Sequence, residues 1–106
     1  LIFYGLEGLN PTSTMADQFA SLVSRARARA GVVQVAAALG RVEEAETVVA
    51  YNANHSWSER IDVLNVEYEF WNEPDRRSAF ATTISMLERF RTVAQANHLK
   101  HWMGRA

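Results

Sequence analysis

Short apolar runs alternate with longer stretches of helical periodicity along this chain of 106 residues. The apolar runs are LIFYGL (residues 1–6), VVQVAAAL (32–39), DVLNVEYEFWN (62–72) and LKHWMG (99–104). Each has the length of a strand, and the stretches between them are long enough for helices that cross back over a sheet. This alternation predicts an α/β domain in which parallel strands are joined by right-handed crossovers.

Three helices are predicted between these strands. Ser13 or Thr14 can cap the first, and Gly31 stands where a helix C-terminus favours glycine. The second and third helices are expected over about 42–52 and 78–97, and Glu73 and Asp75 supply the acidic residues favoured at the start of the third. The residues expected to face the core are Phe19, Leu22, Val23, Ala26 and Ala30 in the first helix, Val42, Ala45, Val48 and Val49 in the second, and Phe80, Ile84, Leu87, Phe90 and Ala94 in the third.

Composition removes several classes of function. A net charge of −1 gives no electrostatic reason to expect a nucleic acid or an anionic membrane as partner, and no run approaches the roughly 20 apolar residues of a membrane span. The chain has no cysteine, so disulfide scaffolds and thiolate metal sites are excluded. The turn after the first predicted strand contains Gly5 and Gly8 without the dinucleotide or phosphate-loop fingerprint, so no nucleotide cofactor is expected.

Two clusters of basic and metal-ligating residue types are interpreted as structural. The arginines of RARARA (25–30) lie two residues apart, about 200° apart around a helix, so they cannot form one stripe and are expected to be a solvated helix end. His98 and His101 have no carboxylate in register, so no metal site is predicted there.

The stretch 62–72 is apolar on one predicted face and polar on the other. Side chains alternate across a strand, so two carboxylates spaced by two residues point the same way, roughly 6 to 7 Å apart. Burying such a pair without partners costs several kcal/mol, and like charges at this spacing favour a protonated carboxylic acid that can act as a general acid. The apolar face is predicted to comprise Leu64, Val66, Tyr68 and Phe70, and the polar face Asn65, Glu67, Glu69 and Trp71.

Two architectures accommodate the order of elements: an open doubly wound sheet, or an arc of a (β/α)8 TIM barrel. Asp62, Asn65, Glu67 and Glu69 occupy the spacing D-x-x-D-x-D-x-E, which resembles the fourth-strand motif of glycoside hydrolase family 18, the chitinases and their relatives. The runs LIFYGLEGL and VVQVAAALG resemble the second and third strands of that family. The resemblance implies a partial (β/α)8 barrel of about three and a half βα units, with residues 1–106 as a fragment of one barrel domain.

The resemblance also implies roles for individual residues. Glu69 would be the catalytic acid that protonates the glycosidic oxygen, and Glu67 would orient the N-acetyl group of the substrate, whose carbonyl oxygen acts as the nucleophile. Asn65 and Asp62 would support substrate binding. For Trp71, a sugar-stacking platform and an ordinary packing aromatic are both open.

The expected activity is therefore hydrolysis of a β-linked glycan, chitin or another polymer containing N-acetylglucosamine, without metal or cofactor. The partners implied are an oligosaccharide or polysaccharide substrate and the remainder of the barrel in the same chain. Because Asn65 and Glu67 stand where the family has aspartates, a carbohydrate-binding barrel without catalysis is the alternative; a parallel-sheet domain with no role in sugar binding is a third. The sequence itself leaves the location open, and only the family resemblance favours a secreted or cell-envelope location.

Overall fold

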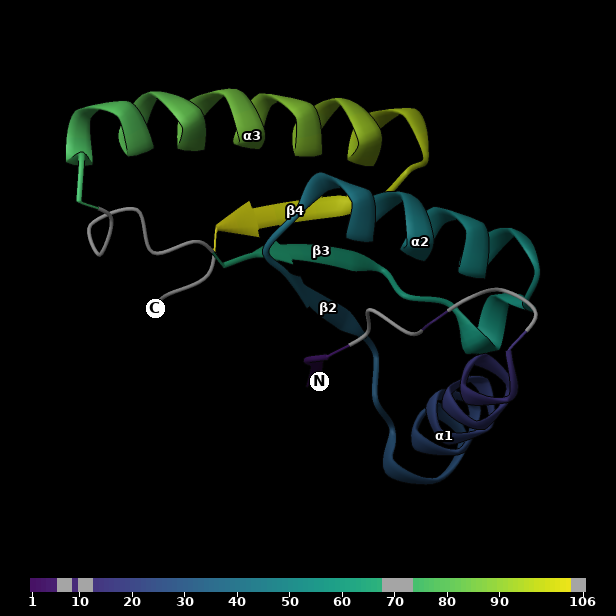
Figure 1. Cartoon of the computed structure of the whole chain (residues 1–106). Coiled ribbons are helices and arrows are strands. Elements are labelled where there is room, and N and C mark those ends of the chain that lie inside the picture. Colours follow the sequence, from purple (N-terminus) through teal and green to yellow (C-terminus); the bar gives the residue numbers. More distant parts are fainter. Residues whose placement is uncertain (6–8, 10–12, 68–73, 104–106) are drawn as a thin grey trace.

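A computed structural model describes residues 1–5, 9, 13–67 and 74–103 of the chain (Figure 1). Strands and helices alternate throughout, as the sequence predicts. The elements are β1 (Ile2–Phe3), α1 (Thr14–Ala30), β2 (Ala36–Leu39), α2 (Val42–Ala53), a 3₁₀ turn (Trp57–Glu59), β3 (Val63–Val66), α3 (Arg76–Ala96) and β4 (Lys100–Met103).

The four described strands form one parallel sheet in the order β1-β2-β3-β4. The chain thus adds each new strand beside the previous one, and the expected α/β class with parallel strands is confirmed. Ala38 of β2 pairs with Asn65 of β3, and Asn65 pairs in turn with Trp102 of β4. Since all strands run the same way, their carboxyl ends meet at one edge of the sheet, toward which the arrowheads in Figure 1 point.

The three helices contribute to a single hydrophobic core on one face of the sheet. Alternate strand residues enter this core: Ala37 and Leu39 from β2, and Leu64 and Val66 from β3. The helices contribute buried residues to the same cluster, which are Ala16, Phe19, Ala20 and Val23 from α1, Val42, Ala45, Val48 and Tyr51 from α2, and Phe90 and Ala94 from α3. The opposite face of the sheet, which carries Asn65, therefore lies outside this core.

The strands are shorter than the apolar runs that predicted them. The second run was expected to be a strand over 32–39, but only Ala36–Leu39 form the strand, and Val33 is 92% exposed. In the third run, the strand ends at Val66, and residues 68–72 lie outside the described part of the chain. Apolar, β-branched composition overestimates strand length because pairing partners, rather than propensity, decide where a ladder ends.

Helix α1 has the predicted ends. Ser13 caps its N-terminus by accepting a hydrogen bond from the backbone N–H of Ala16 at 3.1 Å, and Gly31 closes it in the left-handed conformation with φ 65°. The prediction that Leu22 faces the core is wrong, because its side chain is 52% exposed. The buried stripe of α1 continues through Val23 toward Arg27 instead.

Helix α3 starts two residues earlier than predicted. Asp75 is its N-cap and accepts a hydrogen bond from the N–H of Ser78 at 3.2 Å. Phe90 and Ala94 are buried as expected, whereas Phe80 and Ile84 are 51% and 43% exposed, contrary to the predicted stripe. In Figure 1 the first turns of α3 extend past the carboxyl end of β4, so this half of the helix has less sheet beneath it.

Candidate functional site

Asn65 and Glu67 bring polar groups to the carboxyl edge of the sheet. Asn65 is in β3 between Leu64 and Val66, which both enter the hydrophobic core, so its side chain projects to the opposite face, as predicted. It is 2% exposed. Glu67 directly follows β3, and its backbone N–H donates to the carbonyl of Leu39 at 2.8 Å, which extends the pairing with β2 by one residue.

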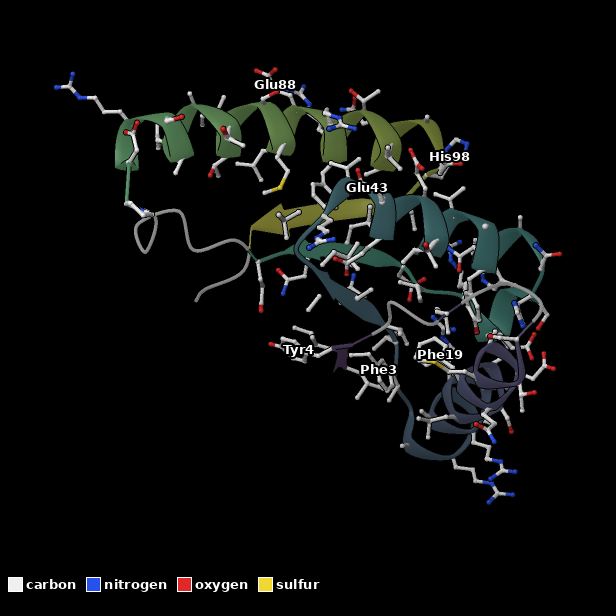
Figure 2. The ribbon with its side chains drawn as sticks, viewed as in Figure 1. Phe3, Tyr4, Phe19, Glu43, Glu88 and His98 are labelled. Atoms are coloured by element: carbon white, nitrogen blue, oxygen red, sulfur yellow. The ribbon has the colours of Figure 1, made fainter. Side chains whose placement is uncertain are left out.

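Tyr4 reaches this pair from the other side of β2. It follows β1 directly, and its hydroxyl donates a hydrogen bond to Oε1 of Glu67 at 3.2 Å. Gly5, the next residue, has φ 68°, a left-handed conformation that favours glycine and turns the chain at this point. Figure 2 shows Phe3 directed toward Phe19 of α1, with Tyr4 directed away from both.

The sequence analysis missed Tyr4. The position of Tyr4 directly after a predicted strand indicated that it lies at the carboxyl edge of the sheet, where Glu67 also lies. The two residues are 63 positions apart along the chain, and no local pattern links them. Only the strand order brings β1 close enough to β3 for this contact.

Asn65 is incompletely satisfied in this cluster. Its Nδ2 donates to Oε1 of Glu67 at 3.4 Å, while its Oδ1 is buried and has no hydrogen-bond partner among the described residues. A buried acceptor without a partner costs about 1 to 3 kcal/mol, and such groups in folded proteins are usually satisfied by water or by a ligand. The cluster therefore presents an acceptor that a ligand O–H or N–H group can satisfy.

The charge of Glu67 acts on Tyr4. The hydrogen bond to Glu67 is the main cause that raises the pKa of the Tyr4 phenol above its ordinary value, and the negative charge of the carboxylate adds to the effect. Tyr4 therefore stays a neutral donor to a higher pH than an isolated tyrosine. Among the described residues, Glu67 forms no ion pair. Its carboxylate accepts hydrogen bonds there only from the Tyr4 hydroxyl and the Asn65 amide.

The remaining predicted site residues are not part of this described cluster. Glu69 and Trp71 lie outside the described residues. Asp62 precedes β3 and thus lies at the opposite, amino end of the strand. It forms ion pairs with Arg27 at 2.6 Å and Arg60 at 3.1 Å and accepts a hydrogen bond from the N–H of Val35 at 2.9 Å.

The Asp62 contacts correct the interpretation of RARARA. Arg25 and Arg29 are exposed, as expected of a solvated helix end, but only 17% of the Arg27 side chain is exposed. Arg27 also donates to the carbonyl of Ser58 at 2.8 Å. The prediction that all three arginines are solvated is therefore wrong for Arg27, which ties α1 to the connection before β3.

A hollow lies at the amino end of the sheet, away from Tyr4; His98, which lines it, and Tyr4 are well separated in Figure 2. Its volume is about 310 Å³, and it includes Trp57, which is 80% exposed and carries the guanidinium of Arg60 at 4.0 Å from its ring centroid. In the described part of the chain, no group of three His, Cys, Asp or Glu side chains is arranged to hold a metal ion.

The helices of the described ranges lack the combination of length and apolar character that a membrane span requires. Comparisons with protein-family models, with curated proteins and with solved structures find no match to this chain.

Proposed function

We propose that this chain is part of a (β/α)8 barrel that hydrolyses a β-linked glycan at the carboxyl edge of its parallel strands. The observation that carries the proposal is the convergence of Tyr4, Asn65 and Glu67 at this edge, with the buried Oδ1 of Asn65 lacking a partner among the described residues. Active sites of such barrels are built at the carboxyl ends of the strands. Hydroxyl-rich sugars supply the donors that this acceptor requires.

The order of the strands favours a barrel over a doubly wound sheet. A doubly wound sheet reverses its strand order at a switch point and has helices on both faces. Here the described strands follow the sequence order β1-β2-β3-β4, and the helices share one core on one face. Right-handed crossovers that always advance in the same direction produce this one-sided arrangement, which a barrel continues until it closes.

The catalytic roles in this proposal come from the resemblance of Asp62 to Glu69 to the motif of glycoside hydrolase family 18. Glu69 is the general acid and base, and Glu67 orients the acetamido group of the substrate. Tyr4 and Asn65 support this assignment of Glu67, because both donate hydrogen bonds to its Oε1. The contacts of Asp62 with Arg27 and Arg60 favour a structural role for that residue rather than contact with substrate.

Replacing the proposed acid provides the direct test. In the barrel with its remaining strands restored, Glu69→Gln keeps the shape of the side chain and removes its acidic proton, so hydrolysis of N-acetylglucosamine oligomers should be abolished while the circular dichroism spectrum is unchanged. The matched control is Glu88→Gln, on the exposed outer side of α3 (Figure 2), which should hydrolyse the oligomers at the rate of the unmodified protein. Retained hydrolysis in Glu69→Gln would contradict the proposal.

A carbohydrate-binding barrel without catalysis is the second candidate. The observation that favours it is the length of Glu67, whose extra methylene relative to aspartate moves the carboxylate by about an ångström, enough to cost up to roughly a hundredfold in rate where position is critical. Calorimetry and a product-release assay on the same oligomers separate the two functions. Binding without release identifies the binding protein, and release identifies the hydrolase.

A further inference from the structure

Tyr4 and Glu67 are joined across an intervening strand. Tyr4 follows β1, Glu67 follows β3, and β2 lies between them in the sheet. Neighbouring strands are about 4.8 Å apart, so β1 and β3 are separated by roughly 10 Å. The Tyr4 hydroxyl nevertheless lies 3.2 Å from Oε1 of Glu67, which requires its side chain to extend over β2.

Small residues on β2 make this reach possible. Side chains of a strand alternate between faces, and Ala37 and Leu39 of β2 enter the core. Ala36 and Ala38 therefore lie on the opposite face, which is also the face of Asn65, the register partner of Ala38. A methyl group at Ala38 leaves room for the longer side chains that meet above it. The result is a shallow floor of alanines between Tyr4 and Glu67.

The hydrogen bonds to Glu67 are concentrated on one of its oxygens. Tyr4 and Asn65 both donate to Oε1, and Oε2 accepts no hydrogen bond from the described residues. Tyr4 is 65% exposed, whereas Glu67 is partly buried. The carboxylate is thereby held at Oε1 and available at Oε2.

We propose that Tyr4 is the positioning residue for Glu67 in glycan recognition: its hydroxyl fixes the carboxylate through Oε1 so that Oε2 accepts a hydrogen bond from the bound sugar. Tyr4 acts through Glu67 and needs no contact of its own with the glycan. This role rests on the proposed function, and it assigns to that site a residue that the family-like motif at 62–69 does not contain.

A double-mutant cycle tests this role in the chain with the remaining strands of the proposed barrel restored. Calorimetry with N-acetylglucosamine oligomers is performed on the unmodified chain, Tyr4→Phe, Glu67→Ala and the double variant. Tyr4→Phe removes only the hydroxyl of an exposed side chain, and it should weaken binding roughly threefold to tenfold, the usual net value of one hydrogen bond. In the Glu67→Ala background the same change should have almost no effect, because the group that Tyr4 positions is absent.

The matched control is Tyr51→Phe. Tyr51 is fully buried in α2, and its hydroxyl donates to the carbonyl of Glu59 at 2.7 Å, remote from the carboxyl edge. This variant loses the same atom but should bind the oligomers with unchanged affinity. A Tyr4→Phe effect that persists undiminished in the Glu67→Ala background would overturn the positioning role, as would affinity that Tyr4→Phe leaves unchanged.

Titration of the phenol separates this role from the proposed function. The absorbance difference between the unmodified chain and Tyr4→Phe isolates the ionisation of Tyr4, whose pKa is raised chiefly by its hydrogen bond to Glu67. In Glu67→Ala that pKa should fall toward the ordinary tyrosine value of about 10. If no oligomer binds, the proposed function fails, and the titration decides the contact by itself. A lower pKa of Tyr4 in Glu67→Ala supports the hydrogen bond by which Tyr4 positions Glu67, and an unchanged pKa overturns the positioning role.

Discussion

At the scale of single residues, Asp62 joins three segments of the chain. Its carboxylate contacts Arg27 of α1, Arg60 of the preceding connection and the backbone N–H of Val35 before β2. The carboxylate is 22% exposed, so these contacts are formed largely out of water, where ion pairs and hydrogen bonds to charged groups are stronger than at the surface. Asp62 therefore fixes the packing of α1 against the amino end of the sheet.

We expect Asp62→Ala to lower the free energy of unfolding by about 2 to 3 kcal/mol, because it removes the ion-pair partner of two guanidinium groups and the hydrogen-bond acceptor of Arg27 and of the Val35 N–H. Asp62→Asn should cost less, since an amide oxygen can still accept from Val35. Urea denaturation followed by circular dichroism measures both.

Asp17→Ala is the matched control for Asp62. The carboxylate of Asp17 is 79% exposed and 3.7 Å from His55, a geometry that contributes little to stability. It should change the free energy of unfolding by less than about 1 kcal/mol. If Asp62→Asn retained full stability but lost affinity for N-acetylglucosamine oligomers, the structural role would be wrong and the substrate-binding role implied by the family resemblance would be supported.

At the scale of elements, local chemistry determines where helices start and stop. The αL conformation of Gly31, with φ 65°, ends α1, and a Cβ added there would meet no atom within 4 Å. Gly31→Ala should therefore lower the free energy of unfolding through backbone strain alone, by about 1 to 2 kcal/mol, the cost of a left-handed non-glycine residue. Thermal denaturation measures the loss.

Gly40→Ala is the control for Gly31→Ala. A Cβ at Gly40 would lie 3.5 Å from the carbonyl oxygen of Glu67, an ordinary van der Waals contact, and Gly40 does not occupy the left-handed region. Its replacement should leave stability nearly unchanged. An equal loss in both variants would mean that the αL conformation of Gly31 is not what matters.

The sequence could predict those features that depend on residues close together in the chain. Ser13, Gly31 and Asp75 were identified as helix-end residues because capping depends on atoms a few residues away. The alternating faces of β3 followed from the period of a strand, which Leu64 and Asn65 confirm. The prediction of buried residues in α3 was wrong at Phe80 and Ile84, because helical periodicity identifies an apolar stripe but does not reveal how far the sheet beneath it extends.

The candidate site was predictable only in part, for the same reason. Asn65 and Glu67 were identified from alternation within one segment, but their partner Tyr4 is 63 residues from Glu67. The ion pairs of Arg27 and Asp62 connect residues 35 positions apart, and the helical angle between the arginines carries no information about such a partner. Contacts of this kind depend on strand order, which the sequence left open between two architectures.

At the scale of the whole molecule, the described sheet has two unpaired edges. Strand β1 pairs only with β2, and β4 only with β3, among the residues described. Apolar side chains are exposed near both ends of the sheet, with Ile2 of β1 at 41% and Ile84 of α3 at 43%. Unpaired strand edges flanked by exposed apolar residues favour association with further strands.

We expect the 106-residue chain to self-associate in a concentration-dependent manner through these unpaired strand edges. A lysine near either edge should oppose association, because its charged side chain would have to be desolvated in the contact. Ile2→Lys and Ile84→Lys should each shift sedimentation equilibrium toward monomer. Val33→Lys is the matched control, because Val33 is 92% exposed in the α1–β2 connection and belongs to no strand, and its replacement should leave association unchanged. A chain that is monomeric at every concentration and melts cooperatively would contradict both the open edges and the proposed barrel, because its sheet would then be complete without further strands.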